Sequence, residues 1–346
     1  MFSKITRYTN QIETAADAKI AWERFMSKVF YITGASGLIG TFLIDTLMFA
    51  NEIYGLNIKI HAICRNEENA KSRFSDYMNS DSFSLIKQNV NLPINMDIQC
   101  DYVIHGASNT HPVAYSTDPI GTIITNVTGT QNVLDFAVKQ NNARVMFLSS
   151  VEVYGENRGD IDKFDESYCG YIDCNTLRAG YPESKRLGEA LCQAYIKAKC
   201  LDIVIPRLSR VYGPTMTKSD SKAIAQFIRK AANKEDIILK SDGEQQYSYT
   251  YVADAAAAIL YILLYGGSGE AYNVSDENSG IMLKDLAQTL ADIAGTRVIF
   301  ELPDETESRG YSKATKAILD NAKLKGLGWD SIYDIRTGLM LTLSVL

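Results

Sequence analysis

The stretch from Lys28 to Leu47 constrains the fold of this 346-residue chain more than any other. An apolar run over residues 28–33 leads directly into Gly34, Gly37 and Gly40, and an apolar helical pattern follows. A buried strand, a glycine turn and a helix in that order present free backbone N–H groups that can bind phosphate. Glycines at this spacing permit a tight turn, close approach of the backbone to a pyrophosphate and close helix–strand packing. The stretch therefore predicts a dinucleotide-binding unit.

Strand-like apolar runs alternate with helical patterns through residue 206, which indicates how the first part of the chain folds. The further strand-like runs cover residues 58–63, 101–108, 144–149 and 201–205. Helices are expected over residues 66–80, 118–140 and 182–199. This alternation predicts an α/β fold, a doubly wound parallel sheet with helices on both faces.

Beyond Pro206 the alternation breaks, and a second, smaller α/β region is expected. Its expected elements are a helix over 223–232, a hairpin over 237–252, a helix from Asp254, and strands near Tyr272 and Val298. The chain thus divides into an N-terminal extension (1–27), a dinucleotide-binding domain (28–206) and a mainly substrate-binding region (207–346). We expect the chain to return to the large sheet around 245–275 and the extension to form a helix that covers a sheet edge.

Composition excludes several classes of partner. The net charge is −6 with a pI of about 5.3, so nucleic acid and anionic membrane surfaces would be repelled. The six cysteines form no Cys-x-x-Cys pair and only three histidines are present, which predicts reduced thiols and no metal site. No signal peptide is visible, and the longest apolar run, residues 255–265, is too short to span a bilayer. We expect a cytoplasmic protein without a nucleic-acid or membrane partner.

Tyr181 and Lys185 form a possible proton-transfer pair. If Pro182 opens a helix, the two side chains are four residues apart and share one face. Lowering a tyrosine pKa from about 10 to about 7 requires roughly 4 kcal/mol. One ammonium at about 4 Å in a dielectric of about 20 supplies roughly that energy. The phenolate could then remove a hydroxyl proton while hydride leaves the same carbon. By itself this spacing also fits an ordinary amphipathic helix, with residues 187, 191, 194 and 198 as its apolar stripe.

Ser150 and Glu152 follow the strand-like run at 144–149. In extended chain, side chains two residues apart point the same way, here out of a strand end. The Ser150 hydroxyl can hydrogen-bond a sugar hydroxyl or its keto form. Glu152 can act as an acid or base, or it can shape the pocket.

Further polar residues are candidates for ligand contacts. A carboxylate after the second strand would favour NAD, whereas Arg65 at this point can accommodate a 2′-phosphate, so NAD and NADP both remain open. Arg207, Arg210 and Arg309 could converge on a substrate diphosphate. His105 and His111 are expected to be packed or hydrogen-bonded rather than catalytic.

Five motifs in order resemble those of the extended short-chain dehydrogenase/reductases. They are Gly34-x-x-Gly37-x-x-Gly40, Asp101-Tyr-Val-Ile-His, Ser149-Ser150-x-x-Val153-Tyr154-Gly155, Tyr181-x-x-x-Lys185 and Val211-Tyr212-Gly213-Pro214. The resemblance runs from about residue 28 to Trp329 and implies a Rossmann-type fold of the NAD-dependent epimerase/dehydratase group. The sequence is most similar to UDP-glucuronate decarboxylases, through Ala107-Ser108, Tyr115-x-x-Asp118-Pro119-Ile120, Glu152, and Asn175 to Lys185 with Arg178.

The resemblance implies a role for each candidate residue. Tyr181 would be the base, Ser150 would bind the C4 oxygen of a sugar, and Lys185 would hold the nicotinamide ribose and lower the Tyr181 pKa. Glu152 and Arg178 would serve the C5–C6 end of the sugar. The cofactor contacts would be Gly34, Ser36, Gly37, Leu38, Ile39, Gly40, Arg65, Asn66, Asn89 (facing the adenine), Val90, Ala107, Ser108, Asn126 and Lys185. The substrate contacts would be Ser108, Glu152, Arg178, Arg210 and Arg309.

Three positions depart from the pattern of these relatives. Val151 stands where 4,6-dehydratases carry an acidic residue. Arg210 replaces an asparagine, and Tyr247 replaces an arginine. The last two changes are on the substrate side, so the sugar or the nucleotide can differ.

These features together predict an enzyme that oxidises a nucleotide sugar at C4 with bound NAD(P), through a 4-keto sugar, most like a UDP-glucuronate decarboxylase. A nucleotide-sugar 4-epimerase or 4,6-dehydratase is one alternative. Another is an NADPH-dependent keto reductase, which Arg65 favours, and a third is a non-catalytic cofactor sensor. The resemblance also implies a homodimer paired through the helices around 120–140 and 182–199.

Overall fold

A computed structural model describes residues 6–110, 112–141, 143–301 and 315–346. Its centre is an eight-stranded sheet in which every strand pair is parallel. The strands run in the order β11-β7-β5-β4-β1-β2-β3, with β6 beside β7. Their bounds are β1 Val29–Thr33, β2 Lys59–Cys64, β3 Phe83–Lys87, β4 Tyr102–His105, β5 Arg144–Phe147, β6 Ser149–Ser150, β7 Asp202–Leu208 and β11 Ala271–Val274. The predicted doubly wound parallel sheet is confirmed.

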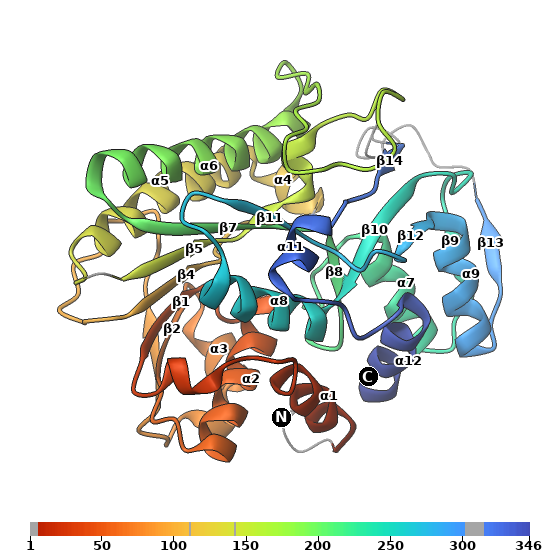
Figure 1. Cartoon of the computed structure of the whole chain (residues 1–346). Coiled ribbons are helices and arrows are strands. Elements are labelled where there is room, and N and C mark those ends of the chain that lie inside the picture. Colours follow the sequence, from red (N-terminus) through yellow and green to blue (C-terminus); the bar gives the residue numbers. More distant parts are fainter. Residues whose placement is uncertain (1–5, 111, 142, 302–314) are drawn as a thin grey trace.

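Helices cover both faces of this sheet (Figure 1). α5 (Pro119–Val138) and α6 (Gly180–Lys199) lie side by side on one face, and α2 (Leu38–Tyr54) and α8 (Val252–Tyr265) lie on the other. Local signals explain where they begin. The Asp118 carboxylate caps α5 by accepting from the Gly121 N–H at 2.9 Å, and Pro182 lies in the first turn of α6. Of the helix expected over 66–80, α3 (Glu67–Arg73) and a 3₁₀ turn at Ser75–Tyr77 are present.

The smaller region contains its own short sheets. One sheet has the order β12-β10-β14, with β8 also beside β10, and β9 pairs with β13. Its elements are β8 Arg210–Tyr212, α7 Ala223–Ala232, β9 Ile237–Leu239, β10 Gln246–Tyr251, β12 Gly280–Met282, α9 Leu283–Ala294, β13 Val298–Phe300, β14 Lys316–Ala317, α11 Ala322–Leu327 and α12 Ile335–Val345. The expected hairpin over 237–252 is wrong, because β9 and β10 each find a parallel partner distant in sequence. α8 and β11 return to the large sheet.

The N-terminal helix α1 (Thr6–Ala16) does not cover a sheet edge as expected. It packs on helices α2, α8 and α12, because its buried residues, Tyr8 and Ile12 among them, meet the helix layer. Gln11 extends this contact to the smaller region, since its side chain accepts from the Tyr251 hydroxyl and donates to the Leu341 carbonyl. α1 therefore joins both parts of the chain.

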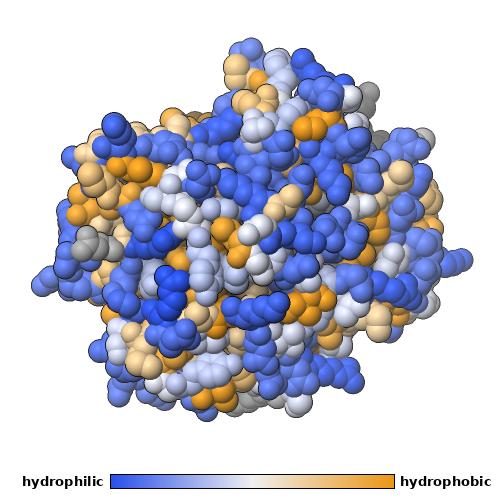
Figure 2. Space-filling view, in the orientation of Figure 1, coloured by the Kyte–Doolittle hydropathy of each residue, from blue (hydrophilic) through white to orange (hydrophobic). Residues whose placement is uncertain are grey.

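The apolar stripe expected on α6 is wrong at three of its four positions, since only Leu191 is half-buried and packs against the core. Leu187 is 47% exposed, and Ala194 and Ala198 are exposed too. The buried face instead carries Gly188, where a Cβ would lie 2.5 Å from the Phe147 ring of β5. Close packing at this glycine brings the helix onto the sheet. The face of the molecule in Figure 2 is otherwise largely hydrophilic.

Candidate active site

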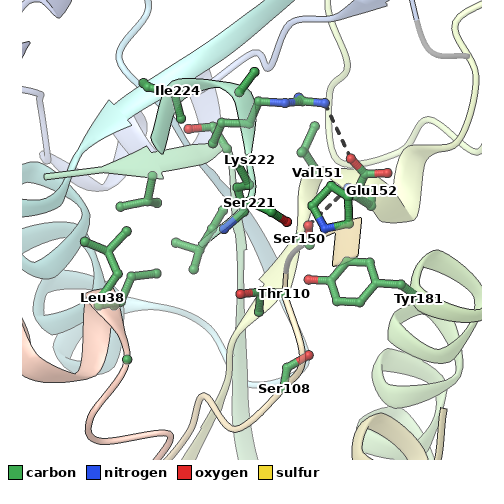
Figure 3. A pocket seen from close by; sticks show the side chains of 18 of the residues that line it. Leu38, Ser108, Thr110, Ser150, Val151, Glu152, Tyr181, Ser221, Lys222 and Ile224 are labelled. Atoms are coloured by element: carbon green, nitrogen blue, oxygen red, sulfur yellow. Dashed lines mark hydrogen bonds and ion pairs between the residues drawn. The ribbon is translucent and has the colours of Figure 1, made fainter. Parts of the chain in front are cut away.

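A cavity of about 850 Å³ lies between the large sheet and the smaller region, at the carboxyl ends of the parallel strands. Ligands of doubly wound sheets bind at this edge. One wall is the glycine turn with Leu38, and another carries Ser150 and Tyr181 (Figure 3). Loop and helix residues of the smaller region, Lys222 among them, complete the lining.

The glycine turn leaves space that only glycines provide. Gly34 has a φ of +70°, and a Cβ there would lie 2.6 Å from the Gly106 backbone. A Cβ on Gly40 would lie 2.4 Å from the Gly34 carbonyl oxygen. The turn leads into the N-terminus of α2, where backbone N–H groups can bind phosphate. This cradle fits the pyrophosphate of a dinucleotide.

Tyr181 is buried, and its hydroxyl points into the cavity beside Ser150 (Figure 3). Its ring stacks on Tyr115, with 4.8 Å between centroids and 24° between planes. Burial raises the pKa of Tyr181 above the ordinary value of a phenol, while hydrogen bonds with Ser150 and Ser108 act in the opposite direction. For the chain alone, the predicted lowering of the Tyr181 pKa is therefore wrong, because burial outweighs the favourable contacts.

Lys185 lies on the buried face of α6, as the four-residue spacing predicts. Its Nζ donates to the Leu148 carbonyl at 2.8 Å and lies 4.8 Å from the centroid of the Phe147 ring. Burial lowers the pKa of Lys185 to about 8, and the nearby Glu189 opposes that change. The lysine is thus held by the strand end that leads to Ser150.

Glu152 lies in the 3₁₀ turn Val151–Tyr154 and is paired with two arginines. Its Oε2 lies 3.5 Å from Arg178, and its Oε1 lies 3.5 Å from Arg210. The Glu152 N–H also donates to the Ser150 hydroxyl at 3.3 Å. This hydrogen bond joins the turn that carries Glu152 to Ser150, the residue expected to bind the C4 oxygen. The Arg210 guanidinium lies 3.5 Å from the centre of the Tyr247 ring. Glu152, Arg178 and Arg210, the predicted substrate contacts, line one wall of the cavity together with Tyr247.

Residues 30–275 match the NAD dependent epimerase/dehydratase family. This chain belongs to that family. UDP-glucuronic acid decarboxylase 3 of Arabidopsis thaliana is 30% identical over 310 residues, which cover 90% of this chain and 86% of the relative. UDP-glucuronic acid decarboxylase 1 of Xenopus tropicalis is 28% identical over 319 residues, with 91% and 71% covered. The family assignment confirms the prediction of an NAD(P)-dependent enzyme of the epimerase/dehydratase type.

Solved structures of similar proteins share the fold of this family member. A UDP-glucuronic acid 4-epimerase from Bacillus cereus, in complex with UDP-glucuronic acid and NAD, superposes with a TM-score of 0.77 at 20% identity, covering 92% of this chain and 98% of the other. A dTDP-glucose 4,6-dehydratase from Streptomyces venezuelae superposes with a TM-score of 0.78 at 21% identity, covering 92% and 96%.

In the parts of the chain that the structure describes, no helix is both long and apolar enough to cross a membrane.

Asn126, a predicted cofactor contact, is a buried bridge behind the cavity wall. Its Oδ1 accepts from the Ser108 hydroxyl at 2.6 Å, and its Nδ2 donates to the Ser184 hydroxyl at 2.9 Å. Ser184 in turn donates to the Tyr181 carbonyl at 2.9 Å. Asn126 is 1% exposed, so it positions Ser108 and α6 without lining the cavity.

The residues predicted to face the adenosine follow the ends of β2, β3 and β4. Arg65 is exposed and lies 3.5 Å from the Asn109 side chain, and Asn66 caps α3. Asn89 is exposed, whereas Val90 is buried against Gly129 of α5, so the expected Val90 contact does not come from an accessible side chain. The residues predicted for the cofactor that do not line the cavity are Ser36, Arg65, Asn66, Asn89, Val90, Ala107 and Asn126.

The two histidines and the remaining arginines differ in outcome. His105 is buried between the hydroxyls of Thr33 and Thr130, so the expected packing and hydrogen bonding of this residue are confirmed. Arg207 was expected near a diphosphate, but its guanidinium donates two hydrogen bonds to the Glu189 carboxylate, at 2.7 and 3.0 Å. Its charge is therefore neutralised by Glu189. His111 and Arg309 lie outside the described residues.

Sequence reasoning missed part of the cavity lining. Lys222, Lys230 and Lys240 line the far side of the cavity, together with Gln245. Lys222 immediately precedes α7, Lys230 lies in the last turn of α7, and Lys240 follows β9, and no motif marks them. Only the expected helix over 223–232 could have indicated that Lys222 and Lys230 lie near its two ends.

Proposed function

We propose that this enzyme uses bound NAD(P) to oxidise a nucleotide sugar at C4, and that UDP-glucuronate decarboxylation is the reaction best supported. The observation that carries the proposal is the Ser150–Tyr181 hydroxyl pair, which faces a cavity whose opposite wall is the glycine cradle. The pair and the cradle come from separate elements, and the fold brings them to one cavity.

The residues of the chain divide the chemistry between them. A bound NAD(P) would supply the acceptor for the hydrogen on C4. Ser150 would hold the C4 oxygen, and Tyr181 would accept the hydroxyl proton, since both hydroxyls face the cavity. The Lys185 ammonium would hold ribose hydroxyls and offset the burial of a phenolate. A 4-keto sugar that carries a carboxylate on C5 is a β-keto acid and loses CO₂ readily.

Two observations favour decarboxylation over its alternatives. Glu152 and its two arginines lie beside Ser150, where the C5 substituent would be, and the decarboxylase of Arabidopsis thaliana is a 30% identical relative. Val151 lacks the acid group that an elimination would need. A 4-epimerase would use the same first step. An NADPH-dependent reductase is supported only by the exposed Arg65.

The test is turnover of UDP-glucuronate by the purified protein supplied with NAD⁺ or NADP⁺. We expect CO₂ and a UDP-pentose, with no net change in cofactor. A UDP-hexuronate epimer without CO₂ would assign the 4-epimerase instead, and net consumption of NADPH with a keto substrate would assign the reductase. Mass spectrometry of small molecules released on denaturation would identify a retained cofactor.

We also propose a homodimer formed through α5 and α6. Their outer faces expose apolar side chains that a monomer would leave in water, with Ile120 74% exposed, Ile124 41% and Leu187 47%. The compartment proposed is the cytoplasm, which the six unpaired cysteines support.

A further inference from the structure

Arg210 is held firmly at the sugar end of the cavity. It begins β8 and is paired in register with Tyr249 of β10, so its backbone is part of the small sheet. Its guanidinium lies 3.5 Å from the centre of the Tyr247 ring, a position that restricts the side chain and adds a cation–π contact. The side chain is only 17% exposed. Arg210 therefore presents its charge to the cavity in one orientation.

The charges around Glu152 do not balance. One carboxylate serves two guanidinium groups, Arg178 and Arg210, each at 3.5 Å. This wall of the cavity thus carries one excess positive charge. The Nη1 atom of Arg210 is buried and has no hydrogen-bond partner among the described residues. A buried, charged donor without a partner is costly, so the arrangement calls for an anionic acceptor from a ligand.

The position of Arg210 indicates which part of a ligand supplies that acceptor. Its partner Glu152 follows Ser150 by two residues, and Ser150 adjoins the Tyr181 hydroxyl. The phosphate cradle at Gly34 and Gly40 belongs to a different wall. An anionic group near Arg210 therefore lies close to the reacting carbon. On a hexose oxidised at C4, the neighbouring carbons carry the C3 hydroxyl and the C5 substituent, and of these two only the C5 substituent can be a carboxylate.

We propose that Arg210 is a specificity-determining residue that binds the carboxylate of a hexuronate through its unpartnered Nη1, with Tyr247 holding it in place. This inference rests on the proposed C4 oxidation and names the sugar class that the site selects. A guanidinium can donate two parallel hydrogen bonds to a carboxylate, whereas the hydroxymethyl group of a neutral hexose offers one uncharged oxygen and leaves the guanidinium charge without a counterion. A buried charge without its counterion is what allows a site to reject the neutral analogue.

The test compares three ligands on the full-length protein saturated with NADH, which occupies the cofactor site but cannot accept hydride from C4, so that no ligand is turned over. Dissociation constants are measured by calorimetry for UDP-glucuronate, UDP-glucose and UDP, with wild type, Arg210→Gln and Arg210→Lys. We expect Arg210→Gln to weaken UDP-glucuronate binding by about 10- to 100-fold, the range for a lost charged hydrogen bond, and to change UDP-glucose and UDP by less than about threefold. Arg210→Lys keeps the positive charge but cannot donate two parallel hydrogen bonds, so its dissociation constant for UDP-glucuronate should lie between those of wild type and Arg210→Gln.

The matched control is Arg158→Gln. Arg158 also lies over a tyrosine, 4.1 Å from the Tyr171 centroid, and pairs with Glu156, but it does not line the cavity. This variant should bind all three ligands like wild type.

The inference is overturned if Arg210→Gln weakens the binding of all three ligands equally, which would make Arg210 a diphosphate ligand, or if it weakens the binding of none. If the wild type binds neither sugar nucleotide, the proposed function falls together with the inference. If the wild type binds both sugar nucleotides and releases CO₂ from UDP-glucuronate, the proposed function stands, and the Arg210 comparison then tests the inference alone. If Arg210→Gln does not fold, the Arg210→Lys variant decides the inference.

Discussion

At the scale of single residues, the burial of Tyr181 determines what the site must supply. Burial favours the neutral phenol and raises the pKa of Tyr181, so a phenolate there needs positive charge nearby. Lys185, on the same face of α6, is the cation that the chain provides, and a bound nicotinamide would add a second. In the proposed mechanism, Tyr181 and Ser150 therefore transfer a proton only when the cofactor is bound.

Replacing the Tyr181 hydroxyl should separate catalysis from binding. We expect Tyr181→Phe to lower kcat by about 10²- to 10⁴-fold, since it removes the proton acceptor and keeps the ring that stacks on Tyr115. Steady-state turnover and cofactor titration would measure both effects, and cofactor affinity should change less than about twofold. Tyr195→Phe on the same helix is the control, because Tyr195 bonds Asp135 on the exposed surface and should leave kcat unchanged. Normal turnover by Tyr181→Phe would refute the role given to it.

At the scale of elements, one close contact with the sheet contributes to the position of α6. Gly188 allows the helix to approach Phe147 of β5, and Lys185 lies over the same ring at 4.8 Å. The contact fixes the depth at which α6 presents both Tyr181 and Lys185 to the cavity.

We expect Gly188→Ala to push α6 outward, because its Cβ would lie 2.5 Å from the Phe147 ring. Overpacking of this kind costs about 1–3 kcal/mol of folding free energy and should also lower kcat. Urea unfolding and turnover would measure the two effects. Gly326→Ala is the matched control in α11, since nothing lies within 4 Å of its Cβ position; it should be neutral or slightly stabilising. Equal effects from the two variants would contradict this explanation.

The contact between α1 and α2 should make stability depend on pH. Asp45 on α2 accepts from the hydroxyls of Tyr8 at 2.5 Å and Tyr77 at 2.8 Å, near the Arg73 guanidinium, and burial raises the pKa of Asp45 to about 6. The folded state then binds a proton more tightly than the unfolded state, so this contribution is greatest below about pH 4 and is lost as the pH rises through about 6.

Asp45→Asn should remove this contribution. Between pH 4 and pH 7 we expect the wild type to lose up to about 3 kcal/mol more folding free energy than the variant, as measured by denaturant unfolding at several pH values. Asp135→Asn is the control, since Asp135 accepts from Tyr195 at 2.6 Å in an exposed tyrosine–aspartate pair. Parallel pH curves for wild type and Asp45→Asn would show that Asp45 is ionised throughout.

Elements with local signals could be predicted from the sequence, and contacts between distant segments could not. The glycine turn, the Asp118 cap and the Tyr181–Lys185 spacing each depend on a few neighbouring residues, and all three are present in the fold. The pairing of β9 with β13 and the Arg207–Glu189 ion pair join segments whose proximity no local pattern indicates. The stacking of Arg210 on Tyr247 depends in the same way on the parallel pairing of β8 with β10.

At the scale of the whole molecule, the exposed apolar side chains of α5 and α6 are explained if two copies associate. α5 and α6 pack side by side, and Ile124 and Leu187 are exposed on them. A second copy could cover both helices and bury these side chains. Tyr181 and Lys185, the proposed catalytic residues of α6, are on its buried face, so association through the exposed face would stabilise the helix without closing the cavity.

A double variant, Ile124→Lys with Leu187→Lys, should convert the proposed dimer to a monomer, because it would bury two charges in the interface. Sedimentation or light scattering would give the mass of each form. Ile53→Lys is the control, since Ile53 is 59% exposed on α2, on the other face of the sheet, and should leave the mass unchanged. A wild type that is monomeric at all concentrations would remove the proposal.

Ser150 and Tyr181 are proposed to direct the oxidation of a sugar at C4. The most direct measurement follows the absorbance of reduced nicotinamide after the NAD⁺-saturated protein is mixed rapidly with UDP-glucuronate. We expect a transient rise that decays as CO₂ is released in the wild type, and no rise in Tyr181→Phe at the same cofactor occupancy. Product formed without any reduced nicotinamide, at equal rates in both proteins, would contradict the claim.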